Sequence, residues 1–294
     1  MKRWKKGLRW INRAWDFCVT SFYAVMIVAI VFSTPPAQKL LCAVKSQFLP
    51  LSSLPTFCRP EAIAAFQILR QMDLPTEVYQ KYPIQGFTIF AIPQTGWQQE
   101  ILSKALEQLR WDLAKLSRLM PPPQFSALQK VPIWLEFGEI KTEIDRIEQG
   151  TAGVYFNSVE WLQRNGYNPD KAGGIGIYDL SDFVQYSPPD QLGLMIHEFA
   201  HAYHYQVLGQ NDAGIRSAYQ QAMKKKLYES VQHISGKEEK AYAAMDQYEY
   251  FAELSVSYFG QNYYYPFNRL QLANHDPAGY RLIEKSWRKP IKIR

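Results

Sequence analysis

The chain has 294 residues, of which 47% are hydrophobic, 15% aromatic and 20% charged. This length allows one large domain or two modest ones with a buried core, and the composition excludes wholesale disorder, collagen-like repeats and a coiled coil. Of the formal net charge of +6, residues 1–16 carry +5 and the remaining 278 residues only +1. Because the cations gather at one terminus, the charge does not indicate a nucleic-acid partner.

The cationic terminus is followed by Phe17–Phe32, a run of 16 apolar or uncharged residues. This order is typical of a secretory signal or a signal anchor, with the basic side left in the cytoplasm. Sixteen residues are fewer than the roughly 20 that span a bilayer, which favours a signal peptide, whereas Pro36 stands where a cleavage site needs a small residue. A buried core helix is the alternative, and it fits poorly with the flanking cations. We therefore interpret residues 1–32 as a signal peptide or signal anchor.

Residues 33–60 are predicted to form a tether. Five prolines lie among short Ser/Leu stretches here, a composition that favours an extended linker over packed structure. Cys42 and Cys58 are the two cysteines downstream of the apolar run. They can close one small disulfide outside the cytoplasm or remain two unpaired thiols, and the sequence supports both. The folded domain is expected to cover residues 61–294.

Within that domain, hydrophobic periodicity predicts strands first and helices later. The expected elements are a helix at Glu61–Met72, a strand at Gly86–Pro93, a long amphipathic helix at Trp97–Met120, strands at Val131–Phe137, Gly153–Asn157 and Gly174–Tyr178, and mostly helical structure from Gln191 onward. The prolines after Met120 end the long helix. This order predicts an α+β fold, with a mixed sheet followed by a helical C-terminal half.

The chemistry-bearing motif is His197-Glu198-Phe199-Ala200-His201, an HExxH sequence. On a helix the two histidines lie one turn apart on one face, so both imidazoles can reach one metal ion. Glu198 can then take a proton from a metal-bound water. The flanks support a helix, because Ser187–Asp190 resembles a capping box and Gly209 suits a C-terminal cap. A surface helix that happens to carry these residues is the alternative, but the apolar neighbours indicate burial.

A second pair of acids follows downstream, Glu249 and Glu253, four residues apart in an otherwise apolar and aromatic segment. Asp246 and Gly260 suit the two ends of a helix there. One acid can serve as a third metal ligand while the other accepts a hydrogen bond from the free ring nitrogen of a ligand histidine. Spacing alone does not decide which acid has which role, and a plain salt-bridging pair is the alternative.

Taken together, HEFAH, Tyr242 and the segment Glu249–Glu253 resemble the metalloprotease domain of anthrax lethal factor and its relatives, which include the Pro-Pro endopeptidases. These are gluzincins of zincin-like fold, and the resemblance is strongest over Gly174–Gly260. It implies that His197, His201 and Glu249 are zinc ligands and that Glu198 is the general base. It also implies that Glu253 is an acid behind the ligands and that Tyr242 assists the oxyanion. The toxin's other domains have no counterpart here, so its substrate is not inherited.

Other candidate residues remain outside this site. His204 lies near the same helix face as the two motif histidines, and it can contact substrate, support a ligand or be a structural residue. His233 and His275 have no convincing partners in the sequence, and Tyr263–Tyr265 is interpreted as packing or a surface patch. Gly153–Asn157 is the candidate edge strand for a bound peptide.

The sequence therefore predicts an exported Zn²⁺ metallopeptidase, secreted or held at the membrane by its N-terminal segment if that segment is not cleaved. Its expected partners are peptide or protein substrates. The alternatives are a zinc-binding pseudoenzyme and an envelope scaffolding module without turnover. The identity of the substrate, the cleavage preference and the oligomeric state do not follow from the sequence.

Overall fold

The computed structural model describes residues 74–94, 96–137, 153–178, 180–186 and 192–290, all within the unit Leu74–Arg294. Several predictions fall outside these residues: the signal segment, the tether with Cys42 and Cys58, the helix at 61–72 and the capping box at 187–190. Within the described ranges, no helix combines the length and the apolar character that a membrane crossing requires.

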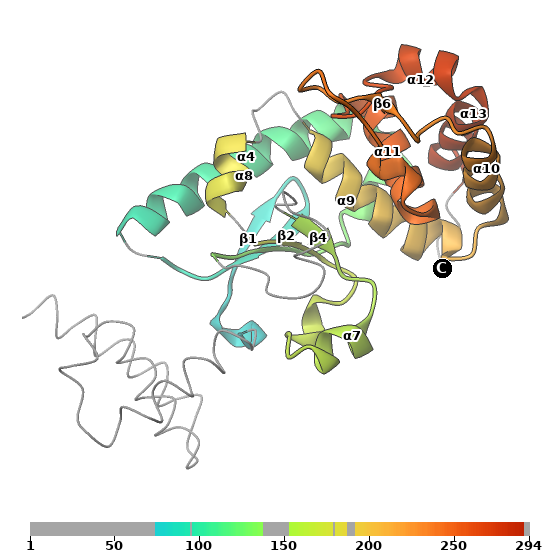
Figure 1. The fold of residues 1–294 in the computed structure, drawn as a ribbon. Coiled ribbons are helices and arrows are strands. Elements are labelled where there is room, and N and C mark those ends of the chain that lie inside the picture. The colour runs from blue at the N-terminus through green and yellow to red at the C-terminus, as the bar shows by residue number, and fades with distance from the viewer. Residues whose placement is uncertain (1–73, 95, 138–152, 179, 187–191, 291–294) are drawn as a thin grey trace, which may run out of the picture. The chain divides into compact units, whose positions relative to one another are not determined.

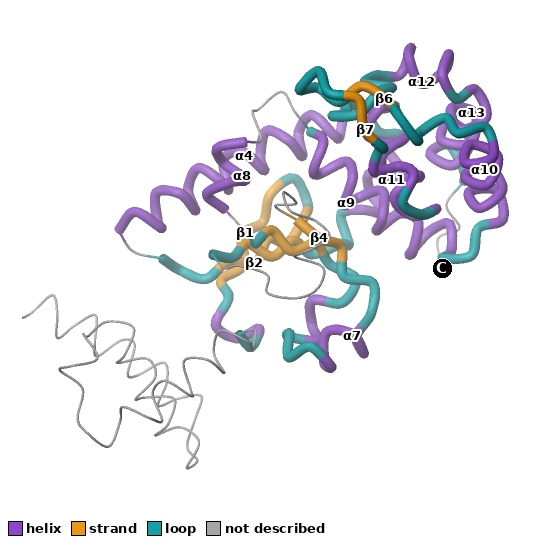
Figure 2. Tube along the Cα trace, in the orientation of Figure 1, coloured by secondary structure: helices purple, strands orange, loops and turns teal. Residues whose placement is uncertain are grey.

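A mixed five-stranded sheet forms the centre of the N-terminal half, with the strand order β1–β2–β3–β5–β4 (Figures 1 and 2). The strands are β1 (Gln80–Ile84), β2 (Phe87–Ala91), β3 (Ile133–Leu135), β4 (Gly153–Tyr155) and β5 (Ile175–Ile177). The three central strands β2, β3 and β5 are parallel, whereas both edge strands, β1 and β4, run antiparallel to their neighbours. Among the described strands, the edge strand β4 has no neighbour on its outer side.

The alternation of side chains along the strands gives the sheet two apolar faces. In β3, Ile133 and Leu135 belong to the main core, and Trp134 between them points to the opposite face, where it stacks on Phe90 at 4.1 Å between ring centroids. This period of two is what pleated geometry imposes. Buried residues on both faces explain why the strands read as short apolar runs in the sequence.

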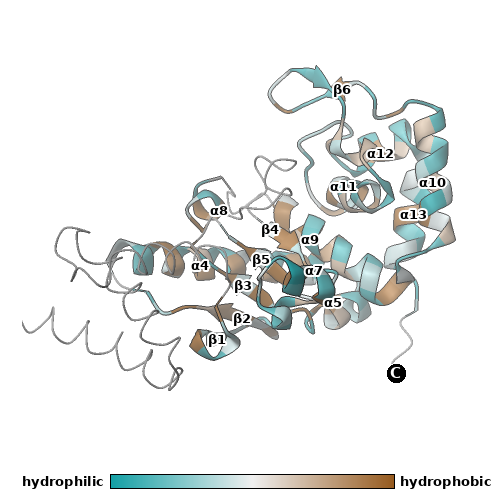
Figure 3. Cartoon of the chain, turned by 60° about the horizontal axis from the view of Figure 1, so that its bottom comes forward, coloured by the Kyte–Doolittle hydropathy of each residue, from teal (hydrophilic) through white to brown (hydrophobic). Residues whose placement is uncertain are grey.

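The long helix α4 (Gly96–Leu119) packs its apolar stripe into the main core. Its buried leucines recur at intervals of three to seven residues, and hydrophilic residues cover the opposite side of the helix. Hydrophobic and hydrophilic residues therefore alternate along α4 (Figure 3). Among the described residues, this half also contains the shorter helices α5 (Pro122–Leu128), α7 (Val159–Arg164) and α8 (Leu180–Tyr186), together with the 3₁₀ turns η3 (Thr76–Val78) and η4 (Pro169–Lys171).

The C-terminal half is helical. Its elements are α9 (Gly193–Tyr203), the π-helical turn η5 (His204–Gly209), α10 (Ala213–Lys224), the 3₁₀ turn η6 (Tyr242–Ala244), α11 (Gln247–Phe259), α12 (Arg269–His275) and α13 (Pro277–Trp287). Helix α9 contacts both β4 and α11, so it joins the two halves (Figure 1). A two-stranded ribbon, β6 (Val231–Gln232) and β7 (Glu238–Glu239), lies outside the main sheet.

These observations confirm the predicted α+β class, the mixed sheet and the helical second half. The predicted strands and the long helix appear within a few residues of their expected bounds, and the helical segment carrying HExxH ends at Gly209, whose φ is +92°. Strand β1 and the ribbon β6–β7 were not predicted. The sequence of β1, QKYPI, combines charged and proline residues that are typical of an exposed edge.

Candidate metal centre

Helix α9 positions two histidines on the face that it turns toward α11. Met195, Ile196 and Phe199 are buried in the main core and hold the helix in place. His197 and His201 lie one turn apart, with 4.7 Å between ring centroids and 3.0 Å between their Nε2 atoms. Both imidazoles are buried, at 8% and 9% exposure. The helix geometry therefore brings two nitrogen donors to one point, as the motif spacing predicts.

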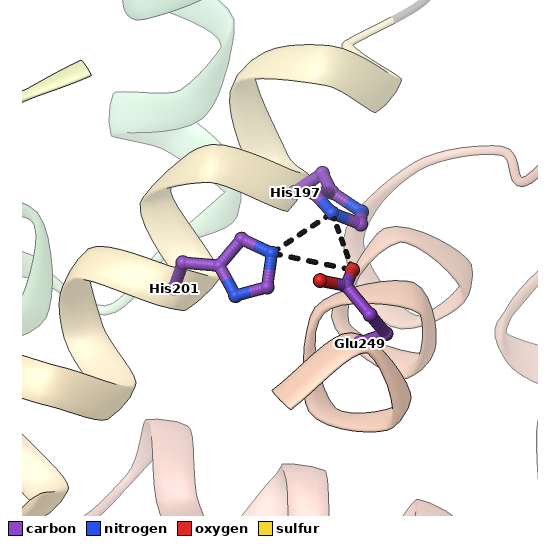
Figure 4. Close-up of side chains that lie close together, drawn as sticks. All are labelled: His197, His201 and Glu249. Atoms are coloured by element: carbon purple, nitrogen blue, oxygen red, sulfur yellow. Dashed lines mark hydrogen bonds and ion pairs between the residues drawn. The ribbon is translucent and has the colours of Figure 1, made fainter. Parts of the chain in front are cut away.

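Helix α11 supplies an acid to the same point. The Oδ1 atom of Asp246 accepts hydrogen bonds from the backbone N–H groups of Tyr248 at 2.7 Å and Glu249 at 2.9 Å, so Asp246 is the N-cap. This cap places Glu249 in the first turn, facing α9. Its Oε2 atom lies 3.0 Å from the Nε2 of His197 and 3.3 Å from the Nε2 of His201 (Figure 4).

Glu253 lies one turn further along α11 and contacts the other side of the first histidine. Its Oε1 atom is 3.0 Å from the Nδ1 of His197. When this Nδ1–H donates to Glu253, the Nε2 of His197 presents a lone pair toward Glu249. This arrangement separates the two acids by role, because Glu249 faces both Nε2 atoms and Glu253 faces only Nδ1.

The donor atoms fit a metal cation. The three residues His197, His201 and Glu249 form a cluster that could hold a metal ion, with their donor atoms within 4.8 Å of one another. The Oε2 of Glu249 is buried, and no described residue donates a hydrogen bond to it in acceptable geometry. A cation among these atoms would satisfy lone pairs that otherwise face one another.

The charges in the cluster shift the pKa values of its members in opposite directions. Burial alone would lower the pKa of His197, but the nearby carboxylate of Glu249 and the hydrogen-bonded carboxylate of Glu253 raise it well above its ordinary value. Burial opposes the charged form of Glu249, yet the neighbouring His201 and His197 outweigh this and lower the pKa of the carboxyl. A metal ion and a proton would therefore compete for the same donor atoms of this cluster.

Glu198 lies beside the cluster and is almost fully buried, at 2% exposure. It lines a cavity of about 300 Å³ together with the three cluster residues. Tyr242 begins the turn η6, and its ring centroid is 5.9 Å from that of His197. Tyr242 is thus close to the cluster, although the described cavity lining does not include it.

The rest of the cavity wall comes from the sheet edge and from aromatic residues. From β4 and the segment after it come Val154, Tyr155, Phe156, Asn157, Ser158 and Trp161; from η5 and the α11 end come Tyr205, Asp246 and Tyr248. The candidate edge strand is thus confirmed as an edge of the sheet and as one wall of the cavity. Among the lining residues, Tyr205, Tyr248 and Trp161 were not predicted as site residues, since no local pattern distinguishes them from packing aromatics.

The remaining histidines lie outside the cluster. His204 is completely buried against Tyr248 and Phe251, and neither ring nitrogen has a hydrogen-bond partner among the described residues. Burial lowers the pKa of its imidazole to about 4, which keeps it neutral. His233 and His275 bond to Ser235 and to the carbonyl of Leu227, away from the cavity.

Comparisons with protein-family models, with curated proteins and with solved structures find no match to this chain.

Proposed function

We propose that this chain is an exported, zinc-dependent endopeptidase of zincin-like fold, related to the lethal-factor group of gluzincins. The observation that carries the proposal is the convergence of His197, His201 and Glu249 on one point, with Glu198 beside them in a cavity. Two histidines and one acid form a donor set typical of catalytic zinc, which leaves a coordination position open for water.

The chain's own groups then have distinct roles. Glu198 accepts the proton of the attacking water and later delivers it to the leaving amine. Glu253 holds the His197 ring through Nδ1. Tyr242, beside that ring, donates a hydrogen bond to the developing oxyanion. A zinc ion bound by the cluster supplies Lewis-acid chemistry, polarising the carbonyl and lowering the pKa of the water.

Strand β4 supports peptides as the substrate class. It is an edge strand of the described sheet and contributes Val154 and Tyr155 to the cavity wall, and an extended peptide can pair with such an edge as an additional strand. Backbone pairing requires a polymer of amides, which favours a peptide over a small amide. The N-terminal cations and apolar run support export, with the domain outside the cytoplasm and the membrane as a partner if the segment stays attached.

Zinc content and peptide hydrolysis of the purified full-length chain in mild detergent test the proposal. Wild type should hold about one zinc per chain and cleave members of a peptide library. The Glu198→Gln variant should keep its zinc while hydrolysis falls by about 10²–10⁴-fold, because only the base is removed. His201→Ala and Glu249→Ala should lose the metal, and Glu253→Gln should weaken metal binding by about 10–100-fold.

Other results would support the alternatives. A zinc-loaded wild type that cleaves nothing, with Glu198→Gln indistinguishable from it, indicates a pseudoenzyme or a scaffolding module. A folded wild type that binds no metal contradicts the metallopeptidase proposal altogether. Loss of zinc in Glu253→Ala and retention in Glu249→Ala would exchange the roles of the two acids.

A further inference from the structure

A second cavity lies on the face of the sheet that is opposite the main core. Its volume is about 290 Å³, and it shares no lining residue with the cavity at the metal centre. Its walls come from β1, β2, β3 and the turns beside them, through Thr76, Lys81, Thr88, Phe90, Gln129, Lys130, Pro132, Trp134 and Asp170. The proposed peptidase mechanism uses none of these residues.

One wall of the second cavity is a row of residues in register across three strands. Lys81 of β1 is the partner of Phe90 in β2, and Phe90 is the partner of Trp134 in β3. The rings of Phe90 and Trp134 stack, and the Nζ of Lys81 lies 5.4 Å from the centroid of the Phe90 ring. The row therefore combines aromatic surface, which can cover an apolar group, with a cation at its outer end.

Trp134 contributes a hydrogen-bond donor that the chain leaves unused. The side chain is 1% exposed, and its indole N–H has no acceptor among the described residues. A buried indole N–H usually has a partner, because an unpaired buried donor is costly, and the indole N–H of Trp287 donates to Ser255 Oγ. Packing against Phe90 and, at 5.0 Å between centroids, against Tyr79 fixes the Trp134 ring. The cavity that Trp134 lines is the space from which a ligand can supply the acceptor.

The charge of the lining is net positive. Lys81 and Lys130 are exposed, and neither forms an ion pair with another residue in the described ranges. Asp170 is the acid among the described lining residues, and its Oδ2 accepts a hydrogen bond from Thr76 Oγ1 at 2.6 Å. Two cations and one acid leave a single positive charge, which a monovalent anion balances and a neutral or cationic ligand does not.

We propose that the second cavity binds a carboxylate carried on an aromatic or other apolar group, at a site separate from the metal centre. The ammonium groups of Lys81 and Lys130 pair with the carboxylate, and the apolar group packs on Phe90 and Pro132. A ligand oxygen accepts the hydrogen bond of the Trp134 indole. Two kinds of molecule offer this chemistry, a free small carboxylic acid and the C-terminal residue of a peptide.

The test follows the ¹H–¹⁵N resonances of the tryptophan indoles in the full-length chain in mild detergent. Trp134→Phe removes one resonance and so assigns it. The probes are N-acetylphenylalanine, which carries a carboxylate, and its uncharged amide. Titration with the acid should shift the Trp134 indole resonance and give a dissociation constant, because a new hydrogen bond changes the environment of the N–H. The amide should bind at least about 5-fold more weakly, since it cannot pair with the lysines.

Two exposed substitutions test the charge without disturbing the buried ring. Lys81→Gln and Lys130→Gln should each weaken binding of the acid by about 3- to 10-fold and leave the affinity for the amide unchanged. The matched control is Lys225→Gln, an exposed lysine at the end of α10 that does not line the cavity, and it should bind the acid as wild type does.

A pentapeptide that ends in phenylalanine with a free C-terminus distinguishes the two sources of the carboxylate. Tighter binding of this peptide than of N-acetylphenylalanine supports the site as a receptor for a peptide C-terminus, and weaker binding supports a small carboxylic acid as its ligand.

Any of three results would overturn the site. They are a Trp134 indole resonance that the acid does not shift at any concentration, equal affinity for the acid and its amide, and lysine variants that bind the acid as tightly as wild type. These measurements require neither zinc nor peptide hydrolysis, so they can fail while the metallopeptidase proposal holds, or succeed where it fails.

Discussion

At the residue scale, the position of Glu198 depends on a glycine in the facing strand. Gly153 begins β4, where a Cβ atom would lie 3.2 Å from Leu194 Cδ1, 3.4 Å from the carbonyl oxygen of Gly176 and 3.6 Å from Glu198 Cγ. These distances leave no room for the branches of a larger side chain. Glu198, the proposed general base, is therefore held between its own helix and a strand that approaches closely because it has no side chain at this point.

Replacing this glycine should separate catalysis from metal binding. In Gly153→Val, the added branches displace Glu198 while the metal-binding residues on α9 and α11 keep their contacts. We expect peptide hydrolysis to fall by about 100-fold, since a base displaced by about 1 Å loses roughly that much. Zinc content should stay at the wild-type value, as measured by elemental analysis of the purified chain.

A second glycine provides the control for this variant. A Cβ at Gly193, the first residue of α9, would have its nearest neighbour at 3.7 Å, an ordinary contact distance. Gly193→Ala should therefore leave both hydrolysis and zinc content near wild type. Full activity in Gly153→Val would show that the strand does not position the base.

The sequence predicts how side chains on one helix lie relative to one another better than it predicts how two helices pack together. His197 and His201 share α9, so their spacing alone places their rings together. Glu249 and Glu253 lie on another helix, and their distances to the histidines depend on how α11 packs on α9, which spacing does not encode. The packing brings Glu249 to both Nε2 atoms and Glu253 to Nδ1.

At the element scale, the long helix α4 carries a buried acid in its apolar stripe. Asp112 is 1% exposed, and both of its carboxylate oxygens lie 3.0 Å from the Nε2 of Gln108, one turn earlier. Burial raises the pKa of this carboxyl to about 7, against smaller opposing effects of Gln108 and the charge of Lys115. The folded chain thus holds a proton here that the unfolded chain, with an ordinary aspartate, has released.

This difference predicts a stability that falls with rising pH. Between the unfolded pKa near 4 and the folded pKa near 7, the folded chain binds more protons, so its free energy of unfolding decreases as pH increases. Asp112→Asn removes this dependence. The free energy of unfolding of the variant minus that of wild type should therefore rise by up to about 3 kcal/mol between pH 5 and pH 8. Urea unfolding of both proteins at the two pH values measures it.

The control is Glu107→Gln, an exposed acid on the same helix. The free energy of unfolding of Glu107→Gln relative to wild type should not change between the two pH values. If the difference in free energy of unfolding between Asp112→Asn and wild type is the same at pH 5 and pH 8, the Asp112 carboxyl ionises at its ordinary pKa in the folded chain.

Elements with one dominant apolar period were predictable, and those built from mixed residues were not. The stripe of α4 and the apolar runs of β2, β3 and β5 are visible as patterns because each is buried. Strand β1 is largely exposed and lies at the edge of the described sheet beside β2, so its residues show no such pattern. The π-helical turn that ends the HExxH segment has no sequence signal in the residues His204–Gly209.

At the scale of the whole molecule, the candidate metal centre lies between α9 and α11, where the sheet half meets the helical half, and side-chain packing also joins the two halves there. Tyr203 at the end of α9 stacks on Trp287 of α13, with 4.2 Å between centroids, and the indole N–H of Trp287 donates to Ser255 Oγ of α11 at 3.0 Å. Phe199 and Phe251 bury their rings in the same core. These contacts hold α9 against α11 without any contribution from the metal.

Removal of the metal should therefore lower the stability of the chain without unfolding it. A ligand that binds only the folded state adds about 2.7 kcal/mol at a concentration 100 times its dissociation constant. For a domain of this size, that corresponds to a melting temperature about 5–10 °C higher with zinc than with a chelator. Circular dichroism should give the same far-ultraviolet spectrum at 25 °C with and without metal. A chain that unfolds on chelation would instead have a structural metal, because a catalytic site is built on elements that other contacts already hold in place.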